Sequence, residues 1–276
     1  MTARGKLPAV LTIAGSDSGG GAGIQADLRT FNAFKVYGCS AITAVTSQNP
    51  NEVRRVDVLS GDAVKCQLET ILAAFPVRFA KSGMLVNREI IGCVAEIISQ
   101  KRIALVVDPV MVSTSGTRLL EQSAIAAMKE LLFPQAAWLT PNIPEAELIC
   151  NKKISSRSDI ADAAKMLYEK FGCSIILKGG HFTNGSCASD IICHEGELFT
   201  LVSPEINIPG NTAHGTGCTL SAALAANLAL GKNWQSSVVA AKAFVYGSLA
   251  ENVLLSDSLR QMYPPEQSFH DQISLY

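Results

Sequence analysis

Short apolar runs alternate with longer amphipathic segments along most of this chain. The runs have the length of buried strands, and the longer segments carry apolar residues at helical spacing. Predicted strands cover residues 9–14, 39–46, 77–81, 103–107, 136–140, 174–178, 189–193 and 198–202. Predicted helices cover residues 23–36, 61–74, 87–100, 119–132, 156–171, 216–230 and 234–250. This alternation predicts an α/β fold in which helices cover both faces of a mostly parallel sheet.

The C-terminal part of the chain departs from this alternation. Residues 189–202 hold two predicted strands separated by His194-Glu195-Gly196-Glu197, which predicts an antiparallel hairpin. From about residue 256 the sequence is polar and irregular, so we expect residues 256–276 to form a loosely packed tail. No repeat, low-complexity tract or linker divides residues 1–276, and we expect a single domain.

Composition narrows the possible classes of protein. The 276 residues are 48% hydrophobic, which suffices for a large core, and the net charge of −1 comes without a run of basic residues. We therefore expect no nucleic-acid partner and no anionic membrane surface. No apolar stretch approaches the roughly 18 residues of a membrane span, and no signal-peptide pattern precedes the first strand.

Eight cysteines occur singly along the chain. No C-x-x-C pair is present, so the usual zinc patterns are excluded and a disulfide framework is not expected. Most of the cysteines lie in apolar segments, where a free thiol behaves as a small hydrophobe. We therefore expect a cytoplasmic protein. Only Cys218 lies at a predicted helix N-terminus, a setting that would lower the pKa of its thiol.

The segment His214-Gly215-Thr216-Gly217-Cys218-Thr219 opens directly into an Ala/Leu-rich helix. The first N–H groups of such a helix lack intrahelical partners and carry the positive end of its dipole. Glycines at 215 and 217 let an anion approach those groups closely, so the loop predicts a phosphate site without a Walker lysine. A glycine-capped helix with a small buried thiol is the simpler alternative.

A second glycine-rich loop, residues 15–23, joins the first predicted strand to the first predicted helix. The spacing of Gly19, Gly21 and Gly23 does not match the dinucleotide fingerprint G-x-G-x-x-G, and the P-loop sequence is absent. A crowded crossover between strand and helix is the simpler interpretation of this loop taken alone.

Polar residues follow five of the predicted strands. They include Gln48, Asp108 and the Asn142–Glu145 segment; Lys178 is the last residue of the predicted strand 174–178 and is followed by two glycines. Each alone is compatible with a turn or a helix cap. Because ligands bind at the carboxyl ends of strands in an open parallel sheet, the whole set predicts one site at that edge.

These segments resemble the hydroxymethylpyrimidine/phosphomethylpyrimidine kinases of thiamine biosynthesis, a family within the ribokinase superfamily. The resemblance runs in order from about residue 7 to residue 250. It is carried by the blocks Ala14–Asp27, Tyr37-Gly38-Cys39, Ser47-Gln48-Asn49, Lys81-Ser82-Gly83-Met84-Leu85, Asp108-Pro109-Val110-Met111, Thr140-Pro141-Asn142, Lys178-Gly179-Gly180-His181 and His214–Thr219. It implies a ribokinase-like domain of three layers, α/β/α.

The resemblance also implies a reaction: ATP with Mg²⁺ phosphorylates 4-amino-5-hydroxymethyl-2-methylpyrimidine to the monophosphate and then to the diphosphate. It places the pyrimidine beside Gly15, Asp27, Gln48 and Met84. It places the nucleotide beside Asp108, Asn142, Glu145 and Lys178, with Asp108 and Glu145 holding Mg²⁺ through water. The anion hole and catalysis fall to Gly215, Thr216, Gly217 and Cys218. The implied partners are these small molecules and a second copy of the chain in a homodimer.

The chemistry of these residue types suits an aminopyrimidine. A carboxylate and an amide together read the donors and acceptors on one edge of the ring, and Met84 would supply an apolar wall. Simpler roles remain for Asp27 as a helix-dipole carboxylate, Met84 as a core residue and Lys178 as a solvated lysine. His181 and His214 would contact phosphate or bond only to backbone.

Cys218 stands where ribokinase-like sugar kinases usually carry an aspartate base. By hypothesis its thiolate accepts the hydroxymethyl proton, although positioning can outweigh basicity in phosphoryl transfer. The second step needs no base, because a phosphate monoester with a second pKa of about 6 is mostly ionised at neutral pH. The hypothesis predicts that Cys218→Ala impairs the first step more than the second.

Three alternative functions remain. A pyridoxal or pyridoxine kinase would share the fold and the Gly-Thr-Gly-Cys loop, although Gln48 with Met84 favours a pyrimidine. A non-catalytic protein would keep the pyrimidine pocket without turnover. A sugar kinase is disfavoured by the cysteine at position 218.

Residues 49–60 and 112–118 are candidate lids that would exclude water from the site.

Overall fold

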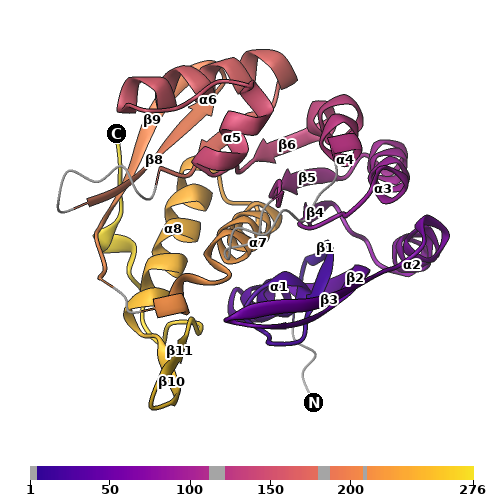
Figure 1. The fold of residues 1–276 in the computed structure, drawn as a ribbon, viewed down its shortest axis with the longest axis horizontal. Coiled ribbons are helices and arrows are strands. Elements are labelled where there is room, and N and C mark those ends of the chain that lie inside the picture. The colour runs from indigo at the N-terminus through magenta and orange to yellow at the C-terminus, as the bar shows by residue number, and fades with distance from the viewer. Residues whose placement is uncertain (1–4, 112–121, 180–186, 208–209) are drawn as a thin grey trace.

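The computed structural model describes residues 5–111, 122–179, 187–207 and 210–276, and its centre is a ten-stranded sheet with helices on both faces (Figure 1). The strand order is β12-β9-β8-β7-β6-β5-β4-β1-β2-β3. Its strands are β1 (Ala9–Asp17), β2 (Tyr37–Asn49), β3 (Glu52–Val58), β4 (Phe79–Ser82), β5 (Ala104–Val107), β6 (Ala136–Leu139), β7 (Ser174–Leu177), β8 (Cys187–His194), β9 (Glu197–Pro204) and β12 (Ser274–Leu275). The α-helices are α1 (Gly23–Ala33), α2 (Gly61–Ala74), α3 (Arg88–Lys101), α4 (Gln122–Ala127), α5 (Ile143–Cys150), α6 (Arg157–Phe171), α7 (Thr216–Ala229) and α8 (Trp234–Ala250).

The middle of the sheet is parallel and its edges are antiparallel. Strands β2, β1, β4, β5, β6 and β7, in this order, pair parallel with one another. Strands β3, β8, β9 and β12 pair antiparallel at the two edges. This arrangement confirms the predicted α/β fold with a mostly parallel sheet, and β8 with β9 forms the predicted hairpin.

Side-chain alternation along the strands divides the core into two apolar clusters. In β5, Leu105 and Val107 belong to one cluster and Val106 to the other, because successive side chains of a strand point to opposite faces. Helices α2 to α6 cover the first cluster, and α1, α7 and α8 cover the second. Residues 222–226 of α7 are fully buried, and all of them except Leu224 are alanine, so this helix packs closely against its surroundings.

Side-chain caps mark where α2, α3, α6 and α8 begin, as Asn142 does for α5. Ser60, Asn87, Ser156 and Asn233 each accept a hydrogen bond from the backbone N–H three residues later. Such caps satisfy donors that have no partner inside the helix. They are local sequence signals, and the predicted starts of α2, α3, α6 and α8 agree with the structure to within one residue.

The sequence prediction does not include β3 and α5. The edge strand β3 lies within residues 49–60, predicted as a lid, and pairs with β2 from Ala44↔Val58 to Asn49↔Glu52. Nearly all of its residues are exposed, so no alternating burial pattern marks it. Helix α5 has only eight residues, which is too short for a clear helical period. The other candidate lid, residues 112–118, and His181 lie outside the described residues.

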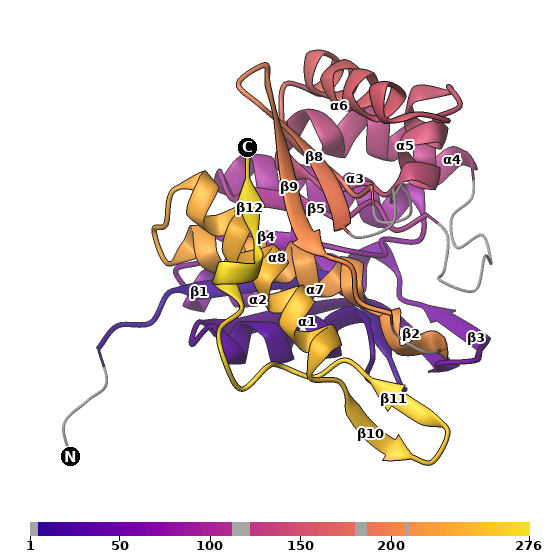
Figure 2. The same ribbon diagram turned by 90° about the vertical axis from the view of Figure 1, so that its left-hand side faces the viewer.

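The C-terminal segment, which we predicted as a loosely packed tail, is mostly exposed but is anchored to the fold at a few residues. Strand β12 adds to the sheet beside β9 (Figure 2), with Ser274 opposite Val202. A separate hairpin is formed by β10 (Val253–Ser256) and β11 (Leu259–Gln261). Met262 and Ile273 are buried. The sequence did not predict these few anchoring residues, because the segment is polar overall and their partners lie far away in the sequence.

No disulfide joins any of the eight cysteines, all of which lie within the described residues. Cys39, Cys173 and Cys193 are buried, and burial raises the pKa of each thiol. These residues therefore behave as small apolar side chains. Within the described residues, no helix is both long enough and apolar enough to cross a membrane.

Candidate active site

A cavity of about 590 Å³ lies at the carboxyl ends of the parallel strands, next to the starts of α1, α5 and α7. This is the position expected for a ligand site in an open parallel sheet. Every predicted site residue except Asp27 lines it: Gly15, Gln48, Met84, Asp108, Asn142, Glu145, Lys178, Gly215, Thr216, Gly217 and Cys218. Residues as far apart in sequence as Gly15 and Cys218 therefore share one cavity.

Helix α7 begins at the wall of this cavity with two glycines. Gly215 has a left-handed φ of 88°, and a Cβ atom there would collide with the carbonyl oxygen of Gly21. A Cβ atom on Gly217 would lie 3.2 Å from Lys178 Nζ and 3.4 Å from Asp108 Oδ2. The absence of side chains thus lets a charged pair lie beside the first N–H groups of α7, where an anion can approach.

Lys178 and Asp108 form that charged pair. The distance from Nζ to Oδ1 is 3.0 Å, and the side chains are 18% and 3% exposed. The Thr140 hydroxyl lies 3.3 Å from the same carboxylate oxygen. Burial alone would lower the pKa of Lys178, but the carboxylates of Asp108 and Glu145 raise it above its ordinary value. Lys178 is therefore a fixed cation rather than a solvated lysine at a strand end.

Asn142 and Glu145 form a capping box at the start of α5. Asn142 Oδ1 accepts the Glu145 N–H at 2.9 Å, and Glu145 Oε2 accepts the Asn142 N–H at 2.8 Å. Burial raises the pKa of Glu145 to about 7; Lys178 opposes this rise and Asp108 adds to it. Both residues thus have a structural role at the cavity wall besides the nucleotide role implied by the resemblance.

The carboxylates at this end suit Mg²⁺ held partly by the protein. Mg²⁺ prefers oxygen ligands, keeps several waters, and is usually held by one or two carboxylates together with substrate phosphates. Asp108 and Glu145 supply two carboxylates to the same cavity. Among the described residues, no group of three or more His, Cys, Asp or Glu side chains gathers to hold a metal. The residues present therefore fit an ion that a bound phosphate helps to hold.

The other end of the cavity has an apolar wall and polar side chains. Gly15 leaves room for Met84, because a Cβ atom on Gly15 would lie 2.6 Å from Met84 Cε. Gln48 Nε2 lies 3.0 Å from His214 Nε2. The same imidazole nitrogen lies 3.3 Å from Asp17 Oδ2. His214 therefore contacts the side chains of Gln48 and Asp17 at this end.

Asp17 organises the glycine-rich loop and is missing from the predicted site residues. Its Oδ1 accepts the Gly19 N–H and its Oδ2 accepts the Ala22 N–H, both at 2.8 Å. Burial would raise the pKa of Asp17, but its contact with His214 and its hydrogen bonds with the loop N–H groups bring the pKa below its ordinary value. An aspartate that bonds to a backbone N–H two residues later makes an Asx turn, so a local signal for this role was present.

The structure places Asp27 behind the cavity wall, which corrects the prediction that it lines the pyrimidine pocket. Its carboxylate is fully buried and accepts hydrogen bonds from Lys81 at 2.9 and 3.0 Å and from the Thr12 hydroxyl at 2.6 Å. Burial would lower the pKa of Lys81, but Asp27 raises it. Lys81 lines the cavity in place of Asp27. The carboxylate turns inward because a buried ammonium needs a counter-charge.

Cys218 lies in the first turn of α7, but its pKa is raised rather than lowered, which corrects the prediction. Burial is the main cause; Lys81 opposes it, and the carboxylates of Asp27 and Asp108 add to it, so the pKa is about 11. The cost of desolvating a thiolate here outweighs the favourable helix dipole. A thiol that is neutral near pH 7 does not support the general-base hypothesis.

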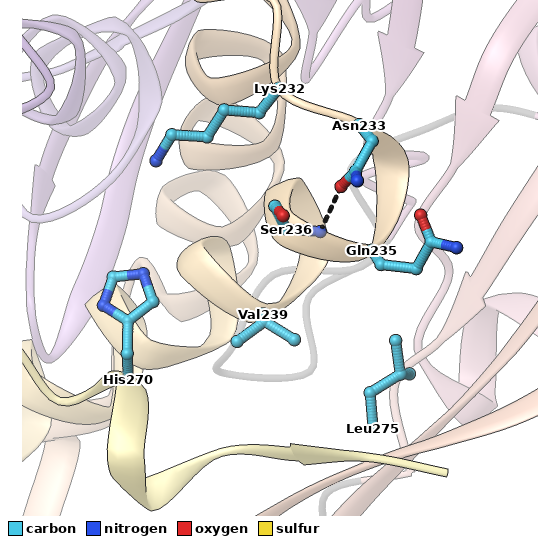
Figure 3. Close-up of a pocket in the computed structure, with 7 residues that line it drawn as sticks. All are labelled: Lys232, Asn233, Gln235, Ser236, Val239, His270 and Leu275. Atoms are coloured by element: carbon cyan, nitrogen blue, oxygen red, sulfur yellow. Dashed lines mark hydrogen bonds between the residues drawn. The ribbon is translucent and has the colours of Figure 1, made fainter.

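A second hollow, of about 650 Å³, lies between the start of α8 and the C-terminal segment (Figure 3). It shares no lining residue with the cavity described above. Most of its side chains are exposed, and the Asn233 amide oxygen is occupied by the Ser236 N–H as the cap of α8. The charged pairs and glycine loops of the predicted site belong to the first cavity.

The three-layer fold, with its site at the carboxyl edge of the sheet, is that of the ribokinase-like proteins, as the sequence predicts. The chain belongs to the phosphomethylpyrimidine kinase family, whose sequence model matches residues 17–262. It is 45% identical over 245 residues to the hydroxymethylpyrimidine/phosphomethylpyrimidine kinase of Haemophilus influenzae, an alignment that covers 87% of this chain and 90% of that protein. The predicted family is thereby confirmed.

Solved structures of two proteins match this fold closely. A pyridoxal kinase from Staphylococcus aureus, in complex with AMP-PCP and pyridoxal, has a TM-score of 0.87 and 32% identity, with 99% of each chain covered. A phosphomethylpyrimidine kinase from Clostridium difficile has a TM-score of 0.76 and 38% identity, with 87% of this chain and 98% of that chain covered. Both proteins are therefore similar to this chain in sequence as well as in fold.

Proposed function

We propose that this chain uses ATP to phosphorylate 4-amino-5-hydroxymethyl-2-methylpyrimidine, first to the monophosphate and then to the diphosphate, a reaction of thiamine biosynthesis. The observation that carries the proposal is a single cavity that joins the start of α7 to the end formed by Gly15, Gln48 and Met84. The family and the name of the Haemophilus influenzae relative support the substrate class. The AMP-PCP in the Staphylococcus aureus structure supports an adenine nucleotide as phosphoryl donor.

At the pyrimidine end, the side chains bind and orient a flat polar ring. Gln48 offers its amide to the polar edge of the ring, and Met84 covers the ring face. His214, which contacts both Gln48 and Asp17, limits the orientations that the amide adopts. The hydroxymethyl group of the substrate then faces the first turn of α7.

At the phosphate end, the protein stabilises negative charge. The N–H groups at the start of α7 receive the oxygens of the transferring group, and Lys178 compensates their charge. Mg²⁺, when bound, would neutralise further phosphate charge, with Asp108 and Glu145 holding it through water. Phosphoryl transfer depends mainly on positioning and charge stabilisation. A neutral Cys218 is compatible with that mechanism.

A pyridoxal kinase is the second candidate. The TM-score of the Staphylococcus aureus pyridoxal kinase, 0.87, is higher than that of the Clostridium difficile phosphomethylpyrimidine kinase, 0.76. A pyridine ring also suits a site made of an amide, a thioether and an imidazole. Sequence identity favours the pyrimidine, at 45% for the Haemophilus influenzae relative against 32% for the pyridoxal kinase.

The test compares substrates on the purified protein with ATP and Mg²⁺, and identifies products by anion exchange and mass spectrometry. Successive appearance of the mono- and diphosphate of the pyrimidine supports the proposal. Phosphorylation of pyridoxal or pyridoxine alone would instead identify the protein as a pyridoxal kinase, the second candidate function. Binding of the pyrimidine in calorimetry, with no ATP consumed on any substrate, would identify a non-catalytic binding protein and refute both.

We also propose that the chain acts as a homodimer in the cytoplasm. The edge strand β3 exposes Val56 and Val58, at 37% and 44%, and an exposed strand edge with apolar side chains favours pairing with a second copy. Eight cysteines without a disulfide among them are typical of a reducing compartment. Light scattering on the full chain tests the assembly: a dimer mass supports it and a monomer mass at micromolar concentration contradicts it.

A further inference from the structure

A buried ion pair lies outside the cavity, between β8 and α8. Lys242 Nζ lies 2.7 Å from Asp190 Oδ2, and the side chains are 11% and 3% exposed. Neither residue lines the cavity. A buried pair of charges loses its hydration and adds little stability relative to apolar residues of similar size. Stability alone therefore does not explain the pair, and its contacts with the backbone indicate its role.

The other carboxylate oxygen of Asp190 holds the backbone at the end of β7. The Gly179 N–H donates to Asp190 Oδ1 at 3.0 Å, and the contact is buried. The antiparallel pairing of β7 with β8 ends at Leu177↔Ile191, so this side chain bonds the chain where the ladder stops. A Cβ atom on Gly179 would collide with the carbonyl oxygen of Ser189. The Gly179 backbone therefore lies directly against β8.

Gly179 follows Lys178, the cation at the phosphate end of the cavity. The Lys178 N–H donates to the Pro141 carbonyl at 2.9 Å, and Lys178 forms a parallel bridge with Asn142. Its ammonium lies 3.0 Å from Asp108. The backbone that carries this ammonium is thus held on one side by the segment after β6 and on the other by Asp190.

We propose that Asp190 is a positioning residue for Lys178. Asp190 fixes the Gly179 backbone, and Lys242 compensates the buried carboxylate and holds its orientation. The Lys178 ammonium is thereby aimed at the phosphates of a nucleotide before that nucleotide binds, which limits the freedom lost on binding. The inference rests on the proposed function only in taking a nucleotide phosphate as the ligand of Lys178.

Two double variants separate the hydrogen bond from the charges. Asp190→Leu with Lys242→Met removes both charges and the acceptor for Gly179, while the interior stays filled. Asp190→Asn with Lys242→Met removes the same charges but keeps an oxygen that can accept from the Gly179 N–H. The difference between the two variants therefore reports the Gly179 hydrogen bond.

Calorimetric titration with AMP-PCP and Mg²⁺ measures nucleotide binding without turnover. We expect D190L/K242M to bind AMP-PCP roughly tenfold more weakly than D190N/K242M, as one lost buried hydrogen bond implies. The affinity for the pyrimidine should agree in the two variants within about twofold, because its end of the cavity is built by other elements. Thermal unfolding of both variants establishes that they are folded.

Lys178 itself supplies the decisive control. On a Lys178→Met background, the difference in AMP-PCP affinity between the two double variants should vanish, because positioning acts through the ammonium. Equal affinities on the wild-type background, or the same difference without Lys178, would overturn the inference. Parallel losses of nucleotide and pyrimidine affinity would also overturn it, since they indicate general loosening.

The same experiment distinguishes this inference from the proposed function. A wild-type chain that binds AMP-PCP but phosphorylates no pyrimidine refutes the proposed function and leaves the comparison of variants fully informative. A wild-type chain that does not bind AMP-PCP overturns both.

Discussion

The carbonyl oxygen of Gly21 stands where a Cβ atom on Gly215 would have to lie. The two residues belong to glycine-rich loops near opposite ends of the chain, and both loops line or adjoin the cavity. Their contact places the start of α1 against the start of α7. Because no side chain fits between them, the loop before α1 and the loop before α7 contact each other through backbone atoms.

Gly215→Ala should therefore lower the unfolding free energy by more than the backbone strain of a left-handed alanine explains. Gly231 has a similar φ, 80° against 88°, but a Cβ atom added there would meet nothing within 4 Å, so Gly231→Ala is a matched control. We expect the control to lose roughly 1 kcal/mol of unfolding free energy and to keep its turnover. Gly215→Ala should lose more stability and at least about tenfold in kcat/KM. Denaturant unfolding and steady-state kinetics measure both; equal behaviour of the two variants contradicts a role for the Gly21 contact.

The Cys218 thiol, with a pKa of about 11, should be unreactive at neutral pH. Iodoacetamide at about pH 7.5 should modify the exposed Cys66 and leave Cys218 intact, because only the thiolate is nucleophilic. Peptide mass mapping gives the extent of alkylation at each site. Alkylation of Cys218 as fast as Cys66 would show that its thiolate is accessible and that burial does not control its pKa.

The neutral thiol also changes what Cys218→Ala should do. We expect losses of similar factor in the two phosphorylation steps, because the side chain then contributes packing at the start of α7 rather than basicity. Each step is measured separately, starting from the hydroxymethylpyrimidine and from its monophosphate. A loss confined to the first step would restore the base hypothesis.

Glu145 should make stability depend on pH between about 4.5 and 7. Burial raises its pKa from 4.5 to about 7, so the folded state binds a proton that the unfolded chain has already released. The stability that this proton provides is present at low pH and is lost as the pH rises toward 7. Glu145→Gln keeps an acceptor for the capping box but does not titrate. Its unfolding free energy should fall less steeply over this range, and parallel curves for the two proteins would contradict the assignment.

Asp17→Ala should affect the pyrimidine more than the nucleotide. The variant removes the acceptor for two loop N–H groups and the partner of His214. We expect the KM for the pyrimidine to rise roughly tenfold and the KM for ATP to change little. Asp57→Ala is the control, since Asp57 is half-exposed and paired with Arg55 on β3. A larger effect on ATP than on the pyrimidine would place Asp17 in a different role.

Elements with strong local signals could be predicted from sequence. The buried strands and the capped helices α2, α3, α6 and α8 depend on residues that are neighbours in the chain, and their predicted positions agree with the structure. The edge strand β3 and the added strand β12 have no comparable signal. Strand β3 is exposed on the sheet edge, and β12 has only two residues, which pair with a strand some seventy positions earlier.

The residues of the candidate site likewise include some whose position could be predicted from sequence and one, Asp27, whose position could not. Glycine loops and the polar residues after strands converge on one cavity because parallel strands end at the same edge of the sheet. Asp27 shows the limit of that argument. It belongs to a motif beside the cavity, yet its carboxylate turns inward to Lys81 on β4 and Thr12 on β1. The local sequence of α1 does not indicate that Lys81, the buried cation that pairs with Asp27, lies beside this helix.

Local sequence was thus enough to establish the alternation of strands and helices, the two glycine loops and the family. Packing between distant segments settled the charge states: the raised pKa of Cys218, the raised pKa of Glu145 and the buried pair of Asp190 with Lys242. The physical reason is that secondary structure follows from neighbours in the chain, whereas desolvation and counter-charges come from whichever elements the fold brings together.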